Sequence, residues 1–128
     1  MSQSIIIDAC GWVAIIDSGM NLDSELERTI GTFELILLDS VLEELMELEK
    51  ERPKRKSLLI SMLDKKSTKT IIESDFTHTD DQIFDLASSG NYAVITVDKN
   101  LKKRLFQSSI KVIEVSKNNH LKVIENLN

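Results

Sequence analysis

Short apolar segments alternate with helix-like segments along this chain, and that alternation is the strongest limit on how it can fold. Four segments have the length and the branched residues of buried strands, namely residues 4–7, 34–38, 92–97 and 110–115. Between them, apolar residues recur at helical spacing, as Leu22, Leu26 and Ile30 do before Gly31. Alternating strands and helices form a mostly parallel sheet covered on both faces. We therefore expect an α/β fold of three layers, α/β/α, with about five strands.

Weaker signals complete this outline. Residues 70–72 are expected to form a further strand, and residues 121–124 fit either an edge strand or a docked tail. Helices are predicted over residues 11–17 and 22–30, from residues 39–40 up to Pro53, around 59–63, from 79–82 to Gly90, and after Asp98. No linker, repeat or low-complexity tract divides the chain, so residues 1–128 are expected to form a single domain.

Composition excludes several classes of protein. With 41% apolar and 29% charged residues, the chain has ordinary globular composition, which argues against intrinsic disorder. No apolar run approaches the ~20 residues of a membrane span, and no signal-peptide pattern is visible. Cys10 is the single cysteine, so an internal disulfide or a cysteine zinc site is excluded. These features favour a cytoplasmic protein without membrane association.

Four acidic residues stand where α/β proteins place their sites. Asp8 and Asp98 each follow an apolar strand, and Asp80 begins a helix after a strand and loop. Glu44 lies between Val41 and Leu48 at the border of an apolar helix face, so we expect it to be less solvated than Glu43. Each aspartate could instead be an ordinary helix N-cap, and Glu44 an ordinary surface residue.

The four acids together favour a metal site. Carboxylates that share one cleft repel one another, and burying them without partners costs several kcal/mol, so a cation is expected. Ligands that are all oxygen select Mg²⁺ or Mn²⁺.

Four segments, in their order and spacing, resemble the motifs of PIN-domain ribonucleases. The segments are residues 5–8 (IIID), residues 41–45 (VLEEL), residues 80–87 (DDQIFDLA) and residues 95–105 (ITVDKNLKKRL). The resemblance covers essentially the whole chain and implies a PIN-like fold. Residues 22–28 and 35–38 look most like archaeal relatives of the small-subunit pre-rRNA processing endonuclease, and VapC-type toxins share the acidic pattern.

The resemblance implies a metal-dependent endoribonuclease that uses two divalent ions and leaves a 5′-phosphate and a 3′-hydroxyl. It assigns catalysis and metal binding to Asp8, Glu44, Asp80 and Asp98, with Asp8 as the bridging ligand. Asp81 would then be an alternate or outer metal ligand, although the simpler interpretation is that its charge interacts favourably with the helix dipole. Cys10 stands where the family often has Asn or Ser, and its thiol can still donate a weak hydrogen bond to Asp8. Val97 replaces the usual Asn before the fourth acid.

Two other residues are candidates for supporting the acids. Thr96 could position Asp98 or a water, but an ordinary β-branched strand residue is the favoured reading. Ser40 is interpreted first as a helix cap.

The basic residues fall into two patches that could hold an RNA backbone, although the net charge is −5. The candidates are Lys54, Arg55, Lys56, Lys99, Lys102, Lys103 and Arg104. A solvated helix face is the alternative for either patch alone. Trp12, Phe76 and Tyr92 are better explained by packing than by base stacking. His78 is more simply a loop residue than a ligand, and His120 gives no signal.

Other functions stay open. A haloacid-dehalogenase-type phosphatase would need Asp at position 10, and no Gly-rich phosphate loop is present. A ribonuclease toxin with a small protein partner shares the same motifs. A non-catalytic RNA-binding or assembly module could keep the fold, with the acids serving as caps. A homodimer through apolar helix faces is also an expectation of the family.

Overall fold

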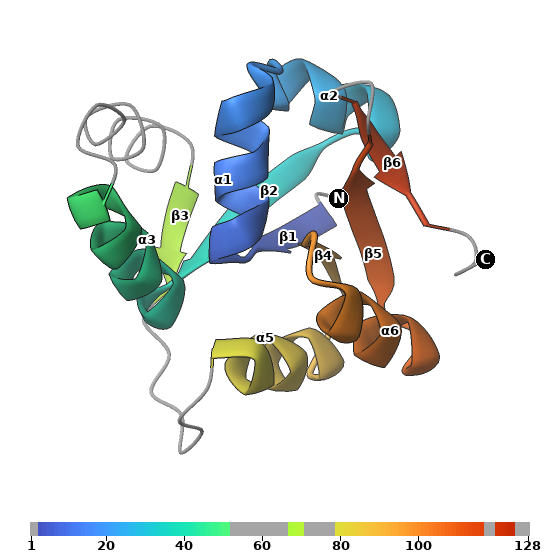
Figure 1. Ribbon diagram of the computed structural model, residues 1–128. Coiled ribbons are helices and arrows are strands. Elements are labelled where there is room, and N and C mark those ends of the chain that lie inside the picture. The colour runs from blue at the N-terminus through green and yellow to red at the C-terminus, as the bar shows by residue number, and fades with distance from the viewer. Residues whose placement is uncertain (1–2, 52–66, 71–78, 117–119, 125–128) are drawn as a thin grey trace.

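The computed structural model describes residues 3–51, 67–70, 79–116 and 120–124 (Figure 1). In chain order its elements are β1 (Gln3–Ile7), α1 (Ala9–Ser18), α2 (Leu22–Thr29), β2 (Phe33–Leu38), α3 (Asp39–Glu51), β3 (Ser67–Thr70), α5 (Thr79–Ser88), β4 (Tyr92–Ile95), α6 (Lys99–Gln107), β5 (Lys111–Val115) and β6 (Leu121–Val123).

The strands of the described residues form one sheet in the order β3-β2-β1-β4-β5-β6. All neighbours are parallel except β5 and β6, which are antiparallel. Figure 1 shows α1, α2 and α3 on one side of the sheet and α5 and α6 on the other, as right-handed crossovers require. The predicted three-layer α/β/α fold with a mostly parallel sheet is confirmed.

Apolar periodicity explains why these segments form these elements. The two central strands have continuous buried runs, Ile5–Ile7 and Ala93–Ile95, because helices cover both of their faces. The helices bury only one stripe each, such as Leu101 and Leu105 of α6. After α2, Gly31 adopts a left-handed φ of 96° and its N–H bonds to the carbonyl of Leu26, which is the predicted glycine stop.

The order of the strands places one position at the centre of the fold. From β1 the chain crosses to β2 and β3 on one side, and it later returns to place β4 on the other side of β1. The carboxyl ends of β1 and β4 are therefore the switch point of the sheet, where α/β proteins commonly bind ligands.

Several boundaries differ from the sequence prediction. The helix predicted to begin at Gly11 begins at Ala9, because Asp8 caps it. The strand predicted to reach Val97 ends at Ile95, and Val97 is exposed. The chain turns out of the sheet at Thr96, because the Thr96 hydroxyl accepts a hydrogen bond from the backbone N–H of Asp98.

Residues 121–124 were expected to form either an edge strand or a docked tail, and the structure shows an edge strand at residues 121–123. The described sheet therefore has one strand more than expected. The strand predicted at 70–72 is seen at Ser67–Thr70. Positions 71–72, Pro53 and the helix predicted around 59–63 lie outside the described residues. Among the helices that are described, none combines the length and the apolar character needed to cross a membrane.

Candidate active site

Asp8 lies at the switch point, between the end of β1 and the start of α1. Its Oδ1 atom accepts a hydrogen bond of 2.7 Å from the backbone N–H of Gly11, which caps α1. Its Oδ2 atom accepts hydrogen bonds from the Thr96 hydroxyl at 2.5 Å and from the Cys10 thiol at 3.1 Å. The carboxylate is only 4% exposed, so these three donors satisfy most of its acceptor sites and fix its orientation.

Thr96 connects Asp8 to the second acid. Its fully buried hydroxyl donates to Asp8 and accepts a hydrogen bond of 3.1 Å from the backbone N–H of Asp98. Asp98 in turn caps α6, where its Oδ1 atom accepts from the N–H of Leu101 at 3.0 Å. Thr96 is therefore more than the ordinary strand residue that the sequence favoured, since one hydroxyl orients two candidate catalytic acids.

Gly11 is a positioning residue that the sequence analysis missed. A Cβ atom at this position would lie 2.8 Å from Oδ1 of Asp8, 2.8 Å from the carbonyl oxygen of Ile95 and 3.2 Å from a methyl group of Ile7. Only glycine lets the first turn of α1 approach the end of β4 this closely. The signal in the sequence was a glycine three residues after an aspartate that ends a strand.

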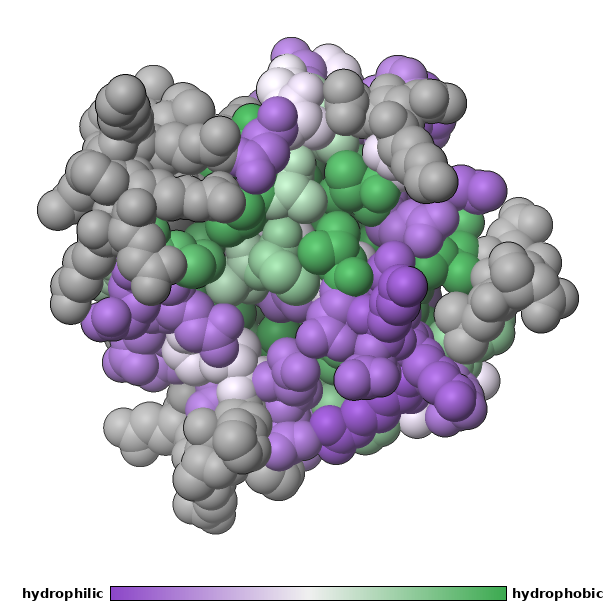
Figure 2. Space-filling view, in the orientation of Figure 1, coloured by the Kyte–Doolittle hydropathy of each residue, from purple (hydrophilic) through white to green (hydrophobic). Residues whose placement is uncertain are grey.

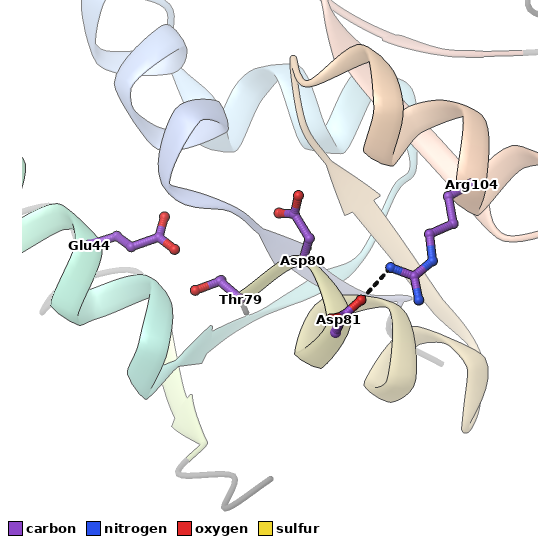
Figure 3. A pocket seen from close by; sticks show the side chains of 5 residues that line it. All are labelled: Glu44, Thr79, Asp80, Asp81 and Arg104. Atoms are coloured by element: carbon purple, nitrogen blue, oxygen red, sulfur yellow. Dashed lines mark hydrogen bonds and ion pairs between the residues drawn. The ribbon is translucent and has the colours of Figure 1, made fainter. Parts of the chain in front are cut away.

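The other two acids line a pocket between α3 and α5. This pocket, with a volume of about 370 Å³, is lined by Glu44, Thr79, Asp80, Asp81 and Arg104 (Figure 3). In Figure 3, Glu44 extends from α3 toward α5, and Asp80 projects into the space between them. Glu44 and Glu43 are both exposed, and Glu44 is the one of the two that lines the pocket.

Ser40 holds the two sides of this pocket together. Its hydroxyl donates a hydrogen bond of 2.5 Å to Oε1 of Gln82, which joins the start of α3 to α5. The predicted role of Ser40 as a cap is wrong, because α3 begins at Asp39 and the Asp39 carboxylate accepts from the Ser40 N–H. Ser40 therefore fixes the helices that carry Glu44 and Asp80.

The carboxylates act on one another electrostatically. Burial raises the pKa of Asp8 against the lowering effect of its three hydrogen bonds, and the charge of Asp98 raises it further. Partial burial also raises the pKa of Asp80, and so do four neighbouring negative charges. In decreasing order of effect, these charges belong to Asp98, Asp8, Glu44 and Asp81. The four predicted acids therefore share one negatively charged region.

Comparison with known proteins agrees with the fold. The family model described as "PIN like domain" matches residues 5–118. The chain belongs to this family. The curated protein Ribonuclease VapC4 of Methanocaldococcus jannaschii is 28% identical over 124 residues, which cover 93% of this chain and 95% of that protein. The solved structure of the PIN domain endonuclease Utp24 superposes with a TM-score of 0.79 at 23% identity, covering 98% of this chain and 93% of that one.

The residues of this PIN-like domain fit a hard divalent cation in their chemistry, although they do not form a complete ligand shell. The donor set is all oxygen, and the mutual repulsion at Asp80 is what a bound cation would relieve. Within the described residues, however, no three Asp, Glu, His or Cys side chains form a group that could hold a metal ion. Asp8 and Asp98 are not among the residues that line the pocket, although both act electrostatically on Asp80.

The structure divides the predicted basic residues of α6 into different roles. Lys102 is paired with Glu114 at 3.3 Å and its side chain is 19% exposed, so it braces α6 against β5 rather than facing an RNA backbone. Lys99 and Lys103 are exposed, and Figure 2 shows polar residues gathered over the part of the surface where α5 and α6 lie. Arg104 lines the pocket and is paired with Asp81. Lys54, Arg55, Lys56, Phe76 and His78 lie outside the described residues.

Two further predictions can be compared with the structure. Trp12 is fully buried, in agreement with a packing role. His120 lies 3.2 Å from Glu25, which belongs to α2 and lies outside the lining of the pocket.

Proposed function

We propose that this PIN-like domain is a metal-dependent endoribonuclease whose centre consists of Asp8, Glu44, Asp80 and Asp98. The observation that carries the proposal is the Thr96 hydroxyl, which ties Asp8 to Asp98 at the switch point, beside a pocket whose two acids carry the same charge. The name of one similar protein, Ribonuclease VapC4, supports RNA as the substrate, and the other similar protein is named an endonuclease.

The acids would hold two Mg²⁺ or Mn²⁺ ions, and such ions would activate a water and stabilise the leaving oxygen of the phosphodiester. The chain itself provides the orientation. Gly11, Thr96 and Cys10 fix the Asp8 carboxylate, and the cap of α6 fixes Asp98. Ser40 keeps the helices of Glu44 and Asp80 together. The products are a 5′-phosphate and a 3′-hydroxyl, and the exposed Lys99 and Lys103 attract the RNA backbone.

The test is cleavage of a 5′-labelled single-stranded RNA with and without Mg²⁺ or Mn²⁺. Wild type is expected to give products only with metal, and Asp8→Asn, Asp80→Asn and Asp98→Asn are expected to give none. Asp85→Asn is the matched control, because Asp85 is an exposed aspartate on α5 that does not line the pocket. RNA that is bound but never cut, together with a melting temperature that metal leaves unchanged, would establish the binding-module alternative instead.

The biological role is a separate proposal. The similarity to VapC4 spans nearly the whole length of both proteins, which favours a toxin ribonuclease restrained by a protein partner, or antitoxin. Ribosomal RNA processing rests on the resemblance of residues 22–28 and 35–38 to relatives of the small-subunit pre-rRNA processing endonuclease. Expression of wild type and of Asp8→Asn in a bacterial host separates the two roles: growth arrest by wild type alone supports the toxin, and unaffected growth counts against it.

We also propose that two copies of this chain form a homodimer through apolar helix faces. Figure 2 shows apolar residues exposed over α1, and Met46 of α3 is 51% exposed. Sedimentation equilibrium measures the mass directly, and the mass of a single chain at all concentrations would reject the dimer.

A further inference from the structure

Two contacts hold the guanidinium of Arg104 on the side of the pocket opposite to Glu44. The Nη1 atom of Arg104 lies 2.6 Å from Oδ1 of Asp81. The Cζ atom of Arg104 lies 4.2 Å from the centre of the Phe84 ring, which is a cation–π contact. Asp81 and Phe84 are three residues apart on α5 and so share one face of that helix, whereas Arg104 comes from α6. Figure 3 shows Asp81 turned toward Arg104 and away from Asp80.

This arrangement leaves most of the guanidinium available to a ligand. Arginine carries five N–H donors in a planar fork, and the ion pair with Asp81 uses the donors on one nitrogen. The side chain is 45% exposed. Of the cationic side chains that the structure describes, Arg104 alone lines the pocket.

A substrate with phosphate groups needs such a positive group at this point. Glu44, Asp80 and Asp81 would repel a phosphodiester that approaches the pocket, and among the described side chains that line it Arg104 carries the positive charge that can offset them. A guanidinium suits a phosphate especially well, because its fork can donate to two phosphate oxygens at once.

We propose that Arg104 binds the phosphate of an RNA nucleotide at the mouth of this pocket and that Asp81 positions Arg104 rather than binding metal. The inference rests on the proposed ribonuclease function. It replaces the reading of Asp81 as an alternate metal ligand, since Oδ1 of Asp81 is paired with Arg104 and the side chain turns away from Asp80 (Figure 3).

The first experiment measures binding of a short fluorescent single-stranded RNA by anisotropy at several KCl concentrations in the presence of Mg²⁺. All proteins carry Asp8→Asn so that the RNA stays intact. Arg104→Ala is expected to weaken binding about tenfold and to lower the slope of log Kd against log salt by about 0.7, the value for one lost contact to a single strand. Arg104→Lys keeps the charge but loses the fork, so it is expected to recover the slope and only part of the affinity.

Lys111→Ala is the matched control. It removes the same charge from an exposed position at the start of β5 that does not line the pocket, and is expected to change affinity by less than about twofold. If Arg104→Ala behaves like Lys111→Ala while the wild-type protein cuts RNA, the phosphate contact is wrong and the proposed function stands. If the wild type neither binds nor cuts RNA, both fail.

A second experiment tests the role of Asp81 by a double-mutant cycle. If Asp81 positions the guanidinium, Arg104→Ala reduces the RNA affinity less in a protein that carries Asp81→Ala than in a protein that keeps Asp81. An equal or larger cost means that Asp81 does not position Arg104. Asp81→Asn, with Asp8 intact, should also keep the stabilisation of the protein by Mn²⁺, whereas a tenfold or greater loss of Mn²⁺ affinity would identify Asp81 as a metal ligand and overturn the assignment.

Discussion

The hydroxyl of Thr96 provides the sharpest test of how this site is built. Thr96→Val keeps the shape of the side chain but removes the donor to Oδ2 of Asp8 and the acceptor for the N–H of Asp98. A hydrogen bond to a charged group contributes about 1.5–3 kcal/mol, and a neutral one about 1 kcal/mol. Because Thr96 is fully buried, water cannot replace either bond, and we expect Thr96→Val to lower the free energy of unfolding by about 2–4 kcal/mol.

Thr96→Ser is the matched control. It keeps the hydroxyl and removes one methyl group, which costs about 1 kcal/mol of apolar burial. Urea unfolding at neutral pH should therefore place the valine variant clearly below the serine variant. Equal stability of the two would show that the hydroxyl bonds contribute little and would refute the reasoning.

The same pair of variants tests the electrostatics of Asp8. The hydrogen bond from Thr96 lowers the pKa of Asp8 against the raising effect of burial, so its loss must raise the pKa further. A carboxylate that has to be ionised for activity then loses activity at a higher pH. The acidic limb of the rate of RNA cleavage against pH should move upward in Thr96→Val and remain in place in Thr96→Ser.

Three further perturbations follow from the same contacts. Gly11→Ala puts a Cβ atom 2.8 Å from Asp8 and from Ile95, so urea unfolding should show a loss of about 1–3 kcal/mol even after the gain in helix propensity; unchanged stability would contradict the close approach. Asp80→Asn should raise the melting temperature of the metal-free protein at neutral pH. The raised pKa of Asp80 makes its ionisation unfavourable to folding, so this gain should shrink as pH falls below the pKa, and a fall in melting temperature would refute it. Glu25→Gln should destabilise the protein at neutral pH, because the carboxylate accepts from Arg28 and from the N–H of Leu121 and has a pKa lowered from 4.5 to about 2. The stability that this residue adds should disappear as pH falls from 4.5 through about 2, so a difference between wild type and Glu25→Gln that persists in stronger acid would contradict it.

The sequence predicted the order of elements because that order depends on local patterns. Alternating strands and helices, the glycine after α2 and the aspartates at strand ends each reflect chemistry within a few residues. The α/β class, the parallel sheet and the family follow from them and are confirmed. The ends of elements were predicted less well. The strand predicted to reach Val97 ends at Ile95, where the Thr96 hydroxyl accepts from the N–H of Asp98 and the backbone leaves the sheet.

What the sequence could not predict depends on partners far apart in the chain. Thr96 lies 88 residues from Asp8, and nothing near it indicates that its hydroxyl reaches that carboxylate. Lys102 and Arg104 look alike in a basic helix, yet one is paired with Glu114 of β5 and the other with Asp81 of α5. A count of basic residues therefore overstates the surface that can hold RNA.

The binding-module alternative is best judged from the two acids that do not cap helices. Capping accounts fully for Asp98 and in part for Asp8, since each accepts a backbone N–H in the first turn of the following helix. It does not account for Glu44, in the interior of α3, and Asp80 has a raised pKa instead of the lowered pKa that a capping bond would give. A protein that needed only the fold could lose Asp80 and gain stability. The presence of Glu44 and Asp80 in one pocket therefore favours a function that needs both negative charges, such as binding a cation. The thermal stabilisation of Asp80→Asn and Glu44→Gln by Mn²⁺ decides the question. Loss of that stabilisation in both variants supports the enzyme, and its absence already in the wild type supports the binding module.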